Sequence, residues 1–214
     1  TGIFSFFMCG CYENVQADLR SFFAFHPWLY VFLIPAVSMR LWSEERKSGT
    51  LEFLLTLPVS PLAAIIGKYL AALAFIALTL SLTAPMWFTV NYLGGPDNGV
   101  ILVSYLGRLL MAGAYLAIGS AMSAATKNQV IDFILTVTIC FLCTVSGLPV
   151  VLDVFSGWSG KELTLAIANI SFLTHFDALQ KGYVALADIV FFVSIITLWL
   201  GITRVIIDTK REAG

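Results

Sequence analysis

Long apolar stretches, separated by short polar ones, run through most of this chain. Several of them reach the roughly 20 residues that an α-helix needs to cross the hydrocarbon core of a bilayer. The short apolar segment 1–8 is predicted to be the end of a first span whose beginning lies outside this sequence. The other predicted spans cover 27–42, 62–92, 100–125, 130–152 and 184–207.

Two polar segments interrupt this pattern. The first, 43–60, contains the densest charge in the chain, Glu44 to Glu52, and we expect a short amphipathic helix at the interface after a turn at Gly49. The second, 153–183, is too polar to span easily. We expect it to form one or two short helices at or dipping into the outer surface, ending near Gly182.

Composition supports a membrane protein. The chain is 59% hydrophobic and 12% charged, whereas a soluble domain carries about a quarter charged residues. Its net charge of −1 gives no nucleic-acid-binding signature. The fold class predicted is therefore all-α: a polytopic helical membrane protein, with 1–214 forming a single transmembrane domain.

The distribution of Lys and Arg predicts the orientation of this domain. Eight basic residues fall on one side of the predicted spans and four on the other, and the richer side is cytoplasmic by the positive-inside rule. The richer side has Arg40, Arg46, Lys47, Lys68, Lys127, Arg204, Lys210 and Arg211. The charged stretch and the C-terminus are thus expected in the cytoplasm, and the intact chain is expected to have six spans.

Two stripes of small residues recur at four-residue spacing within predicted spans, where they would let neighbouring helices approach closely. They are Ala63, Gly67 and Ala71 in one span, and Gly113, Ala117 and Ala121 in another.

Two charged residues lie just inside the predicted span ends, Arg108 and Asp132. Charge within a membrane is costly and often functional, but near an interface it can also snorkel to water. Asp132 could pair with Lys127 or with a neighbouring helix, and the sequence leaves these alternatives open.

The sequence shows no catalytic or metal-binding motif. It lacks GxxxxGK[ST], so the usual cradle for ATP phosphates is absent, and its two histidines, His26 and His175, lack metal-ligand spacing. The pattern alone does not decide whether the stretch from Glu44 to Glu52 is a solvated loop or an element that couples the membrane helices to a soluble partner.

Two motifs bring in a family resemblance. The first, Arg40-Leu-Trp-Ser-Glu44-Glu45-Arg46-Lys47-Ser-Gly49-Thr50-Leu51-Glu52-Phe-Leu-Leu-Thr-Leu-Pro58-Val-Ser, resembles the cytoplasmic element of ABC-2 type permeases, the membrane subunits of ATP-binding-cassette exporters. The second runs through 171–182 and is similar to the gliding-motility-type branch of these permeases. Its outer-segment residues are His175, Phe176, Asp177, Lys181 and Gly182. Family members begin with an interfacial helix and a whole first span, which this sequence does not include.

The resemblance implies a type V exporter-like fold in the bacterial inner membrane, with two permease protomers, identical or different, and separate cytoplasmic ATPase subunits. ATP and Mg²⁺ would bind to the ATPases, and this chain would hold no cofactor and catalyse nothing itself. The predicted ATPase-coupling residues are Glu44, Glu45, Arg46, Lys47, Gly49, Thr50, Leu51 and Glu52.

The resemblance also implies re-entrant outer helices in 153–183 and leaves room for an accessory subunit with a periplasmic domain. The expected function is ATP-driven export of a hydrophobic or lipid-linked cargo. Two alternatives are a membrane subunit that transmits force to a periplasmic partner without transport, and an intramembrane redox or haem protein.

Overall fold

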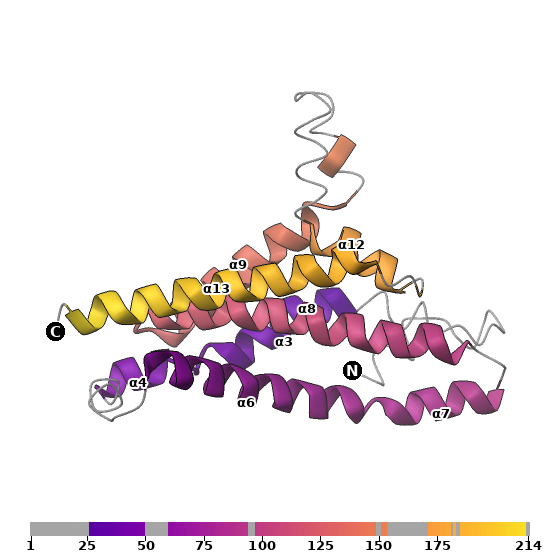
Figure 1. Cartoon of the computed structure of the whole chain (residues 1–214), viewed down its shortest axis with the longest axis horizontal. Helices are drawn as coiled ribbons and strands as arrows, with labels where there is room; N and C mark the ends of the chain where they lie inside the picture. Colours follow the sequence, from indigo (N-terminus) through magenta and orange to yellow (C-terminus); the bar gives the residue numbers. More distant parts are fainter. Residues whose placement is uncertain are drawn as a thin grey trace.

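A computed structural model describes residues 26–49, 60–93, 97–148, 151–153, 171–180, 182 and 185–212 (Figure 1). Every helix or strand in these ranges is an α-helix, as the sequence predicts. The helices are α3 (His26–Ser38), α4 (Ser43–Ser48), α6 (Pro61–Ser81), α7 (Ala84–Leu93), α8 (Asn98–Ala125), α9 (Gln129–Val145), α12 (Phe172–Gln180) and α13 (Leu186–Glu212).

Helix α8 forms the centre of the bundle. It packs against α3, α6, α9, α12 and α13, and its middle is buried on every side (Figure 1). A helix that is apolar all round is expected in such a position. The elements around α8 are therefore positioned chiefly by their contacts with this one helix.

The helix starts follow local sequence signals. Ser60 caps α6 by accepting a hydrogen bond from the Ala63 amide, and Pro61 occupies the first turn. Asp97 and Asn128 cap α8 and α9 in the same way, through the amides of Gly99 and Val130. Polar residues in the turns thus fix where the long helices begin.

Within the described ranges, three helices are long and apolar enough to cross a membrane: Pro61–Ser81, Asn98–Ala125 and Leu186–Thr209. The apolar helix α9 is shorter. The region predicted as one span over 62–92 contains two helices, α6 and α7, with a break at Leu82 and Thr83. The region predicted as a span over 27–42 contains α3, which ends at Ser38.

The two stripes of small residues lie in different surroundings. Gly113, Ala117 and Ala121 are buried within the bundle, and the Tyr69 hydroxyl donates to the Gly113 carbonyl at 3.1 Å. Ala63, Gly67 and Ala71 are exposed, and a Cβ added at Gly67 would meet no atom within 4 Å in the described part of the chain. Packing of this second stripe against another helix stays a prediction.

One end of the bundle gathers α4 and the C-terminal end of α13, while α7 lies at the opposite end (Figure 1). Several predicted features fall outside the described residues and are not placed by the structure. They are the end of a first span at 1–8, the coupling residues Thr50, Leu51 and Glu52 with the amphipathic helix after them, most of the outer segment 153–183, and Lys181.

Candidate functional site

The charged stretch singled out in the sequence forms a compact turn and helix at the α4 end of the bundle. We call residues 39–49 the elbow. It comprises the turn after α3, the six-residue helix α4, and Gly49, which ends α4 in the left-handed conformation with φ of 75°. Because a short isolated helix is unstable in water, α4 depends on what it contacts.

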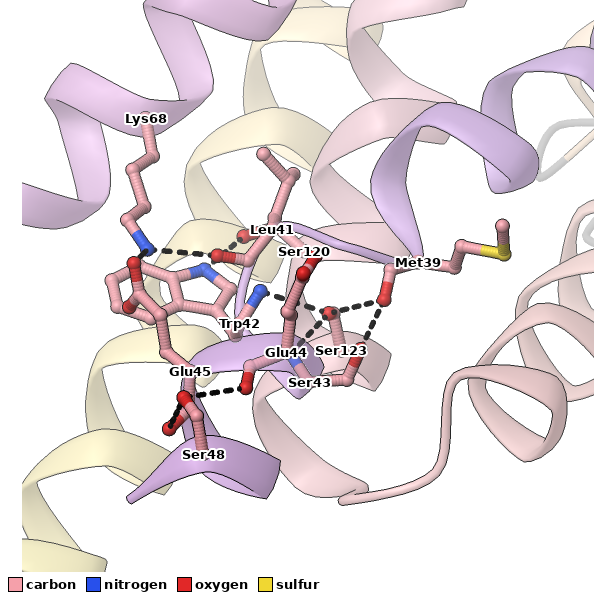
Figure 2. Close-up of polar contacts among 10 residues, drawn as sticks. All are labelled: Met39, Leu41, Trp42, Ser43, Glu44, Glu45, Ser48, Lys68, Ser120 and Ser123. Carbon is pink, nitrogen blue, oxygen red and sulfur yellow. Dashed lines mark hydrogen bonds and ion pairs between the residues drawn. The ribbon is translucent and has the colours of Figure 1, made fainter. Parts of the chain in front are cut away.

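The first amides of α4 are capped by a different helix. Trp42 occupies the N-cap position, but its side chain makes no capping hydrogen bond to α4. Instead, the Ser123 hydroxyl of α8 accepts from the backbone N–H groups of Trp42 and Ser43, both at 3.1 Å (Figure 2). The start of the elbow is thereby tied to α8, about 80 residues further along the chain.

Trp42 anchors the elbow to three helices. Its side chain is 1% exposed and clusters with Ile65 of α6, Ala124 of α8 and Ile207 of α13. The indole Nε1 donates to the Ser120 hydroxyl of α8 at 3.2 Å. This one side chain therefore lies where α6, α8 and α13 meet.

Lys68 joins the elbow to α6. Its ammonium forms an ion pair with Glu45, donates to the Leu41 carbonyl at 2.8 Å, and lies 4.1 Å from the centroid of the Trp42 ring (Figure 2). A salt bridge, a hydrogen bond and a cation–π contact together fix the Lys68 ammonium against the elbow more firmly than an isolated surface ion pair would.

Arg46 faces the bundle as well. Its guanidinium donates to the Ala124 carbonyl at 2.6 Å, in the last turn of α8, where the helix dipole favours positive charge. Burial at this contact lowers the pKa of Arg46 from its ordinary value. Of the predicted coupling residues, Glu45 and Arg46 thus bind the elbow to the helix bundle, through α6 and α8.

Glu44 and Lys47 lie on the other side of α4. Both are exposed, as are Ser48 and Gly49, and the Ser48 hydroxyl closes the end of the helix by donating to the Glu44 carbonyl at 2.9 Å. The six residues of α4 therefore divide into a face held by the bundle and a charged face that is open to a partner.

The outer-segment residues lie far from the elbow along the bundle. His175 of α12 contacts Asp188 of α13 with 2.6 Å between Nδ1 and Oδ1, and its ring stacks on Phe191 at 4.0 Å. Phe176 is buried, Asp177 is exposed, and Gly182 follows α12 with φ of 83°. These contacts fasten α12 onto the first turns of α13.

The snorkelling alternative for Arg108 and Asp132 is wrong, because both side chains are fully buried. Arg108 lies in the core with its guanidinium 5.1 Å from the centroid of the Tyr105 ring. Asp132 accepts a hydrogen bond from Thr136 on its own helix at 3.2 Å. Its helix packs against α8, and no ion pair joins Asp132 to Lys127 among the described residues.

Sequence reasoning did not single out Trp42, Ser120 or Ser123, and it treated Lys68 only as one of the cationic residues that set orientation. The signal that could have found Trp42 is its position between Arg40 and Glu44, where a large aromatic side chain interrupts a polar stretch. The serines of α8 carry no such signal.

The long apolar helices and the buried central helix define a multi-pass membrane protein, consistent with the expected class. The family model for the ABC-2 family transporter protein matches residues 12–200. The chain therefore belongs to the ABC-2 transporter family and is a permease component of an ATP-binding-cassette exporter. A search of curated proteins finds no match.

Proposed function

We propose that this permease couples to cytoplasmic ATPase subunits through the elbow, and that movement of the elbow is passed to α8. The observation that carries the proposal is the division of α4 into two faces. Glu45 and Arg46 are bonded to α6 and α8, whereas Glu44 and Lys47 are exposed. A rigid element that is fixed to the bundle and open on its other side can transmit mechanical work between two bodies.

The proposal places the elbow and the C-terminus in the cytoplasm of a bacterial cell, with the protein in the inner membrane. Four basic residues support this orientation, because they gather at the α4 end of the bundle, where the positive-inside rule favours the cytoplasm. They are Lys47, Lys68, Lys127 and Arg204, in addition to Arg40 and Arg46 of the elbow. Two protomers, identical or different, would act with two ATPase subunits, which would bind ATP and Mg²⁺.

The cargo we propose is hydrophobic or lipid-linked. Among the described residues, many polar side chains within the bundle bond to backbone carbonyls or to one another, as Thr144 does with the Cys140 carbonyl at 2.6 Å and with the Tyr115 hydroxyl at 2.5 Å. Apart from such groups, the core packed around α8 is lined by apolar side chains in the described part of the chain. A cargo moving along an apolar surface between protomers fits this packing better than a hydrated solute does.

Reversing the two exposed charges, in the double variant Glu44→Lys, Lys47→Glu, should weaken binding of the ATPase subunit. Charge reversal at a complementary contact costs several kcal/mol, so we expect affinity to fall about tenfold or more. The measurement is copurification of the coexpressed ATPase with the tagged permease. Asp153→Lys is the control, because this exposed residue lies beyond the far end of α9. Unchanged copurification of the double variant would contradict the proposal.

Reversing Lys68 should have a different effect. Lys68→Glu places two carboxylates together and removes the donor to the Leu41 carbonyl, so the elbow should loosen from α6 while its outer face remains. We expect the ATPase to copurify but to lose the change in ATP hydrolysis that the bound permease causes in reconstituted vesicles.

The exchanged pair Glu45→Lys, Lys68→Glu restores opposite charges and serves as the control for this effect. It should recover part of the lost response, because the ion pair is restored while the bond to Leu41 is not. If Lys68→Glu alone behaves like the wild type, or also abolishes ATPase binding, the two faces of α4 do not have separate roles.

A further inference from the structure

The Ser123 hydroxyl that caps α4 both accepts and donates hydrogen bonds, and its partner as a donor is the question here. Its oxygen accepts from two amides, those of Trp42 and Ser43, which occupies both of its acceptor positions. Its proton points to the Met39 carbonyl at 3.3 Å, longer than the usual 2.5–3.0 Å range for such bonds. That carbonyl already accepts from the Ser43 hydroxyl. Met39 is therefore a weak acceptor for Ser123.

A second acceptor lies on α9. Thr136 packs against α8 opposite Gly119, where a Cβ added to the glycine would lie 3.3 Å from the Thr136 methyl group. Only the short turn 126–128 joins α8 to α9, so one turn along each helix from this contact brings Asp132 opposite Ser123. Asp132 is fully buried, and its Oδ2 has no hydrogen-bond partner among the described residues. A buried polar atom without a partner is costly.

We propose that Asp132 is a positioning residue for the elbow: its Oδ2 accepts a hydrogen bond from the Ser123 hydroxyl and so holds the hydroxyl oxygen toward the first amides of α4. This assignment satisfies both the Ser123 proton and the buried carboxyl oxygen. In this arrangement α9 supports the cap together with α8, although α9 is distant from the elbow in the sequence. Its effect on coupling rests on the proposed function, but the positioning itself does not.

Hydrogen–deuterium exchange of the permease alone, reconstituted in lipid nanodiscs, tests the positioning without any ATPase. The readout is the exchange rate in peptides that contain the amides of Trp42 and Ser43. Asp132→Leu and Ser123→Ala should each raise this rate about tenfold, as loss of roughly one buried hydrogen bond predicts. The double variant Asp132→Leu, Ser123→Ala should exchange no faster than either single variant, because each substitution removes the same capping interaction.

Asp132→Asn should exchange near the wild-type rate, since its amide oxygen can still accept from Ser123. Replacing a buried carboxyl with leucine is favourable for insertion, so Asp132→Leu should remain folded. Thr138→Val is the matched control. It removes a hydroxyl from the exposed face of the same helix, and that hydroxyl bonds the Ile134 carbonyl and no other described residue, so the exchange rate should not change.

If Asp132→Leu exchanges like the wild type while Ser123→Ala is fast, the Ser123 hydroxyl donates to the Met39 carbonyl instead and the proposal fails. It also fails if Ser123→Ala has no effect, or if Asp132→Asn is as fast as Asp132→Leu. A failure of the ATPase to bind the elbow would leave all these rates unchanged. The result therefore separates this inference from the proposed function.

Discussion

Replacing Trp42 with alanine is expected to detach the elbow from the bundle and to lower the thermal stability of the purified permease. Removing a buried tryptophan from a packed core costs about 3–5 kcal/mol. At this position the loss also removes the bond to Ser120 and the ring beneath Lys68. The first measurement is the midpoint of thermal unfolding, and the second is ATP hydrolysis by the reconstituted complex, which should no longer respond to the permease.

Trp42→Phe separates packing from hydrogen bonding. Phenylalanine keeps an aromatic ring for Lys68 but cannot donate to Ser120, so we expect a loss of about 1 kcal/mol and partial retention of the ATPase response. The matched control is Trp28→Ala on α3, because Trp28 is only partly buried and contacts Phe141 at 6.2 Å, away from the elbow. If Trp42→Ala and Trp28→Ala had the same effects on both measurements, Trp42 would have no special part in the elbow.

The sequence predicts a charged stretch between apolar spans, because charge is rare in this chain and is concentrated there. The amphipathic helix expected after Gly49 lies outside the described residues, whereas α4 precedes Gly49. The sequence does not predict which charged side chains of α4 face the bundle and which face away from it. Glu44 and Glu45 are adjacent and chemically alike, yet one is exposed and the other pairs with Lys68. Which side of α4 faces the bundle depends on α6 and α8, and no local pattern in a six-residue helix records that.

The cap on α4 shows a related limit. N-caps are usually read from the residue just before a helix, as Ser60, Asp97 and Asn128 show for longer helices. At α4 that residue is Trp42, and the cap comes from Ser123 on another helix. A serine in a small-residue helix gives no sign that it caps a distant segment, so only the folded arrangement reveals it.

The small-residue stripe in α8 was only partly informative for the same reason. Four-residue spacing selects Gly113, Ala117 and Ala121, which are indeed buried. A tighter approach of α3 occurs at Gly119, on another face of the same helix. Because α8 is enclosed on all sides, small residues occur on several of its faces, and spacing alone does not tell which face meets which neighbour.

Gly119→Ala is therefore expected to push α3 away from α8 and to displace the elbow that follows α3. An added Cβ would lie 2.5 Å from the Ser38 Cβ and nearer still to the Ser38 hydroxyl oxygen, and both side chains behind it, Ser38 and Thr136, are buried. Such overpacking costs about 1–3 kcal/mol, and this outweighs the roughly 0.5–1 kcal/mol that alanine gains over glycine within a helix. The midpoint of thermal unfolding should fall accordingly.

A second-site change and a matched glycine make this prediction specific. Ser38→Gly removes the atoms that the new methyl group would meet, so the double variant Gly119→Ala, Ser38→Gly should recover part of the lost stability. Gly201→Ala in α13 should instead keep or raise the unfolding midpoint, since a Cβ there meets nothing within 4 Å in the described part of the chain. If Gly119→Ala were as stable as Gly201→Ala, α3 and α8 would not be in close contact at Ser38. In that case α3 would position the elbow less firmly than the bonds of the elbow to Ser123 and Lys68 indicate.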